Sequence, residues 1–188
     1  MPFALAFALL AAQPVTPDPQ EVPAAQGDFS GVDWEKEFGV EKKVADPVTG
    51  EFPVEPYQQG PANAGAGPFT GESMARAFGG QDGIHRIVDR LVVLSESDPR
   101  ISAIFKSRDL VRLRRTLFEQ FCFILNAGCI YSGREMQAAH KDLGITRADL
   151  NALVENLQQA MREGQVPFAA QNRFLAKLAP MDRQVVER

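Results

Sequence analysis

The sequence predicts an all-α domain from residue 72 onward, preceded by a long N-terminal extension. Apolar residues recur at helical spacing through the second part of the chain, and no alternating, β-rich stretch interrupts them. Nine of the thirteen prolines, in contrast, fall between Pro14 and Pro68. The 188 residues suit one domain plus a tail, and the net charge of −4 offers no basic footprint for nucleic acid.

The first helices are expected on either side of a glycine pair. Residues 73–78 suit a short helix that Gly79 and Gly80 end. Residues 81–97 suit a longer helix, because five apolar side chains share one of its faces. These are Ile84, Ile87, Val88, Leu91 and Val92. Pro99 then fixes a turn.

Three further long helices are expected, over residues 109–126, over residues 146–164 and from Pro167 to the end. Thr146 opens the second of these with Asp149 as its capping-box partner. Pro180 is a possible bend in the last one. The apolar stripes are Leu110, Leu113, Leu117, Phe121 and Ile124, then Leu150, Leu153, Val154, Leu157 and Met161, then Phe174, Leu175, Leu178 and Val185.

The stretch from Gly133 to Thr146 carries His140, one of only two histidines. Met136 and His140 stand four apart, so on a helix they share a face, and Gly144 ends that helix. A neutral imidazole at the end of a short helix can serve as the axial ligand of a haem iron. A solvent-facing or hydrogen-bonded histidine is the alternative for a lone residue of this type.

A series of landmarks accompanies this histidine. In chain order they are Phe78-Gly79-Gly80, Asp98-Pro99-Arg100, Ile104-Phe105, Asn126-Ala127-Gly128, Tyr131-Ser132-Gly133, Ala139-His140, Leu143-Gly144-Ile145-Thr146 and Gly164 to Pro167. In this order and spacing, residues 74–186 resemble a truncated haemoglobin, most closely the group 1 branch. The resemblance implies a two-over-two helical sandwich around haem. The haem would be haem b, because no Cys-x-x-Cys-His attachment motif is present.

The resemblance also implies a role for each pocket residue. His140 would be the iron ligand, and Phe105, Leu113, Leu117, Phe121, Met136 and Ile145 would contact the cofactor, although without haem these apolar residues would simply be core. Arg112 suits either a haem propionate or solvent. His85 lies seven residues before Val92, an axial offset of roughly 10 Å. We therefore expect a surface His85 and a five-coordinate iron.

Two departures from the group 1 pattern concern the distal side. Val92 stands where many members carry a tyrosine, with Leu91 before it, and Leu117 stands where the branch often carries a glutamine. A hydrogen bond to bound O₂ in a dry pocket is worth roughly 1.5–3 kcal/mol. We therefore expect O₂ release about tenfold to a hundredfold faster than with a donor present.

Three functions fit the sequence. The first is a haem protein that binds O₂, NO or CO, served by a reductase that the sequence does not identify. The second is an NO-detoxifying or peroxidase-like enzyme on the same scaffold, although peroxidase chemistry gains from a distal acid–base residue and none is apparent. The third is a non-haem helical interaction module in which the proline-rich extension is the functional part.

The N-terminal region suggests export. Residues 3–12 are an unbroken apolar run that is too short to span a bilayer but fits the core of a secretory signal, so residues 1–12 are a candidate signal peptide. Residues 13–71 are expected to form a flexible extension, in which a patch around Trp34 either docks on the helical domain or on a partner, or forms a transient helical turn.

The two cysteines, Cys122 and Cys129, stand seven residues apart. On a continuous helix their Cα atoms would lie roughly 10 Å apart, beyond disulfide reach. We therefore expect two free thiols, with a bridge only if Gly128 breaks the helix early.

Overall fold

The computed structural model describes residue 37, residues 44–106 and residues 108–187. The apolar run at residues 3–12 and the Trp34 patch lie outside the described residues. Residues 44–187 belong to one compact unit, in which the described residues form helices and no strand. None of the described helices has the length and apolar character needed to cross a bilayer. The predicted all-α domain is confirmed.

The helices follow the predicted order. The described elements are η1 (Pro61–Ala64), α2 (Ser73–Ala77), α3 (Gly80–Ser97), α4 (Ser102–Phe105), α5 (Leu110–Ile124), α6 (Met136–His140), α7 (Arg147–Glu163), α8 (Phe168–Leu178), η2 (Ala179–Met181) and α9 (Asp182–Val185). The capping box at Thr146 and Asp149 is present, with hydrogen bonds in both directions. The predicted bend at Pro180 is confirmed, because η2 separates α8 from α9.

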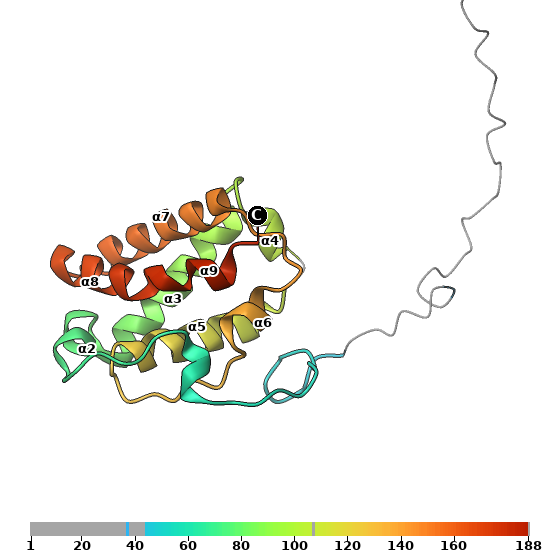
Figure 1. The fold of residues 1–188 in the computed structure, drawn as a ribbon, viewed down its shortest axis with the longest axis horizontal. Coiled ribbons are helices and arrows are strands. Elements are labelled where there is room, and N and C mark those ends of the chain that lie inside the picture. The colour runs from blue at the N-terminus through green and yellow to red at the C-terminus, as the bar shows by residue number, and fades with distance from the viewer. Residues whose placement is uncertain (1–36, 38–43, 107, 188) are drawn as a thin grey trace, which may run out of the picture. The chain divides into compact units, whose positions relative to one another are not determined.

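The helical core is built around α3, which packs against both α5 and α7 (Figure 1). All five residues of the predicted α3 stripe are at most 2% exposed. Phe174 of α8 closes the core, with its ring edge-on to Phe121 at 4.9 Å and to Phe78 at 5.1 Å between centroids. The pairs α3–α5 and α7–α8 form the two-over-two helical sandwich that was expected.

Residues 44–71, which we call the strap, differ from the expected flexible extension. Ala64 is fully buried, and its carbonyl accepts a hydrogen bond from Gln120 of α5 at 2.9 Å. The Phe69 amide donates to the Ile124 carbonyl at 2.8 Å. The expected flexibility is therefore wrong for residues 44–71, because polar contacts with α5 hold this proline- and glycine-rich segment against the helices.

The expectation of two free thiols is also wrong. Cys122 and Cys129 form a disulfide with a Cα–Cα distance of 5.5 Å. The helix ends at Ile124, and positive φ angles of 59° at Asn126 and 88° at Gly128 turn the chain back. The distance of roughly 10 Å applied only to an unbroken helix.

Candidate functional site

The imidazole of His140 is held by its own helix. Its Nδ1 lies 2.7 Å from the carbonyl oxygen of Met136, one turn earlier in α6. Because a carbonyl only accepts hydrogen bonds, Nδ1 carries the proton in the neutral ring, and Nε2 keeps a free lone pair. A histidine in this state is prepared to bind a metal through Nε2, with the carbonyl fixing its tautomer and orientation.

The turn after His140 is fixed by the C-terminal segment. The Glu187 carboxylate accepts hydrogen bonds from the amides of Asp142 and Gly144, at 2.7 and 2.6 Å. The Glu187 amide in turn donates to the Ile145 carbonyl at 2.9 Å. Asp142 adopts a positive φ of 63°, a conformation that a non-glycine residue needs such support to keep. These hydrogen bonds fix the backbone that follows α6.

The predicted pocket residues fall into two groups by burial. Phe121, Met136 and Ile145 are at most 8% exposed. Phe105, Leu113, Leu117 and His140 are only half-buried by the chain itself. The same holds for the first part of the α7 stripe, whose members are Leu150, Leu153 and Val154.

These half-buried apolar side chains suit a flat, apolar cofactor. On α5 and α7 the second half of each stripe is buried, whereas the first half keeps exposed carbon surface. Figure 1 shows α4, which carries Phe105, at the same end of the helical domain as α6. A porphyrin and its iron need both kinds of group, uncovered apolar side chains and an imidazole with a free Nε2.

Met136 contacts its surroundings through both its side chain and its carbonyl. Its sulfur lies 3.2 Å from the Gln120 amide nitrogen, which also lies 3.8 Å from the sulfur of Met181. The Met136 side chain is thus enclosed by protein groups. Its carbonyl accepts the hydrogen bond from His140.

Arg112 is engaged within the chain rather than by solvent. Its guanidinium lies 3.1 Å from the Glu51 carboxylate and 3.4 Å from the Asp109 carboxylate, and it donates to the Phe52 carbonyl. The side chain is 23% exposed. The structure therefore gives Arg112 carboxylate partners from the strap and from the start of α5.

The second histidine lies at the surface, as predicted. The His85 side chain is 61% exposed, its Nδ1 lies 3.0 Å from Asp89, and its ring contacts Phe118. On the same helix Leu91 and Val92 are 2% and 1% exposed, so neighbouring side chains already cover them. Leu113 and Leu117 are the predicted distal residues that keep exposed carbon surface.

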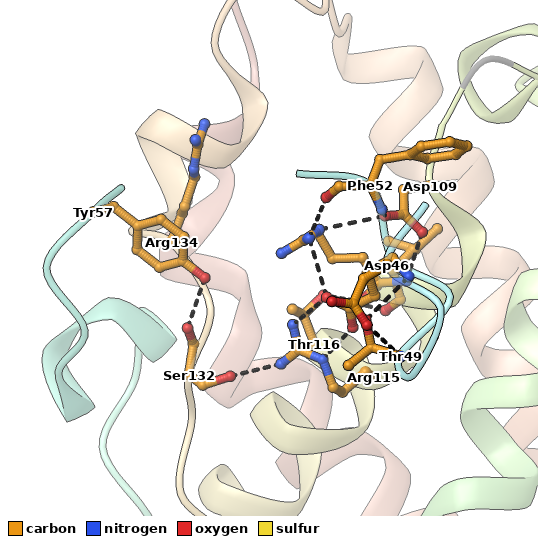
Figure 2. Close-up of polar contacts among 12 residues, drawn as sticks. Asp46, Thr49, Phe52, Tyr57, Asp109, Arg115, Thr116, Ser132 and Arg134 are labelled. Carbon is orange, nitrogen blue, oxygen red and sulfur yellow. Dashed lines mark hydrogen bonds and ion pairs between the residues drawn. The ribbon is translucent and has the colours of Figure 1, made fainter. Parts of the chain in front are cut away.

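A polar network joins the strap to α5 and to the loop before α6 (Figure 2). Burial raises the pKa of Glu119, but hydrogen bonds from Ser132 and the Arg115 guanidinium outweigh it and leave the pKa lowered. Burial acts likewise on Asp109, where amide hydrogen bonds from Arg112 and Phe52 and the Arg112 charge leave the pKa lowered. These carboxylates are therefore ionised near neutral pH.

Sequence reasoning missed two buried polar residues, Glu51 and Gln120, and the strap residue Tyr57, whose hydroxyl donates to the Ser132 carbonyl. Glu51 is 8% exposed and contacts Arg115, 64 residues away in the sequence. No helical or strand period marks it. A charged residue between prolines resembles solvated linker until its partner is known.

Solved structures of truncated haemoglobins share this helical arrangement. The Fe(III) form from Tetrahymena pyriformis matches with a TM-score of 0.59 at 20% identity, over 61% of this chain and 98% of that one. A 2/2 haemoglobin from Synechococcus, solved with covalently attached haem, matches with a TM-score of 0.58 at 21% identity, over 62% and 99%. The helical domain thus has the fold of a truncated globin.

Sequence relatives agree with this fold. The bacterial-like globin family model matches residues 73–187, and the chain belongs to that family. A group 1 truncated haemoglobin of Chlamydomonas moewusii is 28% identical over 93 residues, which are 48% of this chain and 54% of that protein. One of Mycolicibacterium paratuberculosis is 24% identical over 108 residues, 57% and 79% of the two chains. Membership of the family implies a haem protein that binds diatomic gas.

Proposed function

We propose that this protein binds haem b through Nε2 of His140 and takes up O₂, NO or CO on an apolar distal side. The observation that carries the proposal is the hydrogen bond of 2.7 Å between His140 Nδ1 and the Met136 carbonyl. It leaves Nε2 as the one ring nitrogen with a lone pair. Phe105, Leu113 and Leu117 supply uncovered apolar surface for the porphyrin.

When bound, the haem supplies an iron that coordinates the gas. The chain supplies one imidazole ligand, a carbonyl that fixes the tautomer and orientation of that imidazole, and apolar side chains that exclude water. Leu113 and Leu117 offer only carbon to the gas. Without a hydrogen-bond donor, bound O₂ loses more stabilisation than bound CO does, because O₂ is the more polar ligand. The pocket should therefore discriminate little in favour of O₂ over CO.

Haem uptake by the purified full-length protein tests this function. We expect a pyridine haemochrome spectrum of haem b from the wild type and at least a tenfold weaker haem affinity in His140→Ala, because the iron loses its protein ligand. His85→Ala is the matched control, since the His85 side chain is 61% exposed, and it should retain haem. Equal haem retention by both variants would disprove the assignment of His140.

We also propose that the protein is exported. The apolar run at residues 3–12 supports this, as does the disulfide between Cys122 and Cys129, because disulfides persist mainly in oxidising compartments. A reporter fused to residues 1–30 should leave the cytoplasm, whereas the same reporter on residues 13–30 should remain inside. A reporter retained inside with either segment would contradict export.

A further inference from the structure

The strap contacts the residues that lead directly into the histidine helix. The Tyr57 hydroxyl donates to the Ser132 carbonyl at 2.8 Å, as Figure 2 shows. Arg134 donates to the Glu55 carbonyl at 3.0 Å, and its guanidinium lies 5.2 Å from the centre of the Tyr57 ring. Tyr57 thus contacts the loop both through its hydroxyl and through its ring.

A third contact of the strap involves Gly133, the residue between Ser132 and Arg134. Asn63 donates from its amide to the Gly133 carbonyl at 3.2 Å. A Cβ atom at Gly133 would lie 2.2 Å from the Tyr131 hydroxyl, so this loop leaves no room for another residue type. The Tyr131 hydroxyl donates to the Arg134 carbonyl at 3.0 Å, and burial raises the pKa of Tyr131 to about 12. Three consecutive loop residues are therefore held by the strap.

The strap also packs on the first residue of α6. Gln120 donates to the Ala64 carbonyl and lies 3.2 Å from the Met136 sulfur, so it joins strap and helix. A Cβ atom at Gly65 would lie 2.9 Å from the Met136 side chain, which shows how closely the strap backbone approaches. Met136 is the residue whose carbonyl accepts from His140.

A buried carboxylate anchors this arrangement. Glu51 forms a two-pronged ion pair with Arg115 and a second contact with Arg112. Arg115 also donates to the Ser132 hydroxyl at 2.6 Å, and Glu119 accepts from the Ser132 amide at 2.9 Å. Ser132 is thus held by α5 and by the strap together.

We propose that the strap is a positioning element for His140, resting on the proposed role of His140 as iron ligand. Glu51 anchors the strap on α5, Tyr57 fixes the loop, and Gln120 links Ala64 to Met136. Together they keep the Met136 carbonyl where His140 Nδ1 needs it. Release of the strap frees that carbonyl, so the imidazole tilts and holds the iron less firmly.

The experiment uses the full-length holoprotein carrying Glu51→Gln together with Tyr57→Phe. Glu72→Gln is the control, since Glu72 forms only an exposed ion pair with Arg76 in its own turn. Amide hydrogen exchange in residues 132–136 reports strap docking. The iron–histidine stretching frequency of the ferrous protein, from resonance Raman spectra, reports the orientation and bond strength of the His140 imidazole. The rate of haem transfer to excess apomyoglobin reports how firmly the protein retains its haem.

In the double variant we expect faster exchange in residues 132–136, a shifted or broadened iron–histidine band and haem loss at least roughly fivefold faster, the factor that one lost hydrogen bond implies. The control should match the wild type. Faster exchange with an unchanged band and unchanged haem loss would overturn the proposal, because the strap would then hold the loop without affecting the histidine. Unchanged exchange would overturn it as well, since Glu51 and Tyr57 would not hold the strap.

Failure of the haem assignment gives a different result. If the wild type takes up no haem, the proposed function is wrong, and exchange in the apoprotein still shows whether the strap holds residues 132–136. If the wild type shows an iron–histidine band that the double variant leaves unmoved, the haem assignment stands and the positioning role is wrong.

Discussion

At the scale of single residues, the orientation of one imidazole and the absence of polar atoms at the distal leucines define the site. His140 is fixed through Nδ1, and its turn is closed by Glu187. Leu117 keeps exposed carbon surface where the group 1 pattern often has an amide. Both features concern named atoms, so each can be tested by a single substitution.

Leu117→Gln should slow O₂ dissociation by about tenfold or more, because a new donor contributes roughly 1.4 kcal/mol toward bound O₂. CO dissociation should change much less, since CO is the less polar ligand. Leu117 suits this test better than Val92, which neighbouring side chains already cover. Stopped-flow release of both gases provides the measurement.

Phe118→Gln is the matched control, because Phe118 is the next residue on α5 and contacts the surface residue His85. It should leave both dissociation rates unchanged. Slow O₂ release by the wild type, at the rate of Leu117→Gln, would contradict an apolar distal side.

Asp98 provides a pH-dependent test of the turn between α3 and α4. Hydrogen bonds from the Arg100 side chain and amide hold the pKa of Asp98 well below its usual range, and Asn156 of α7 also donates to it at 3.2 Å. A depressed folded-state pKa stabilises the protein above the unfolded value, about 3.9, and this contribution disappears as the pH falls through the folded value.

Asp98→Asn should therefore unfold at lower denaturant concentration than the wild type between about pH 5 and pH 8. The difference should shrink as the pH falls below about 4, because the Asp98 carboxyl of the unfolded wild-type chain then takes up a proton while the folded one is still ionised. Denaturant titrations across this pH range provide the measurement. A difference that stays constant to pH 2 would show that the Asp98 charge is not its source.

At the scale of helices, the sequence was sufficient wherever local rules decide the structure. The α3 stripe has a helical period, and the Thr146–Asp149 capping box acts within four residues, so both were predicted correctly. The disulfide was not predicted, because its formation depends on the backbone conformation at Asn126 and Gly128 rather than on the sequence spacing of the two cysteines.

The packing of the strap on the helices was not predicted, for a related reason. Its composition suits a chain that cannot form a core of its own. It is nevertheless ordered by partners far along the sequence, such as Arg115 for Glu51 and Ser132 for Tyr57, which are 64 and 75 residues away. The same holds for the candidate site, where the sequence predicts His140 as a ligand but the hydrogen bond between its ring and the Met136 carbonyl required the structure.

At the scale of the whole molecule, the strap belongs to the globin domain. A chain that starts at residue 72 lacks Glu51 and the fully buried Ala64, and it leaves the guanidinium groups of Arg112 and Arg115 without their shared carboxylate. Loss of a partner from a partly buried ion pair is destabilising. We expect its melting temperature to fall by about 5 °C or more relative to the full-length chain.

A chain that starts at residue 44 keeps every described strap contact and is the matched control. It should melt within about 2 °C of the full-length protein, since a change of 1 kcal/mol corresponds to several degrees for a domain of this size. Equal melting of the chains that start at residues 44 and 72 would show that the strap contributes nothing to stability.

The ferrous iron–histidine stretch in a ligand-rescue experiment tests the role of His140 most directly. The wild type should show the band, and His140→Gly should lack it, because no other described histidine lies at the site. Added imidazole should restore a band by occupying the vacated position, whereas His85→Gly should behave as the wild type does. A band that persists in His140→Gly before imidazole is added would contradict His140 as the iron ligand.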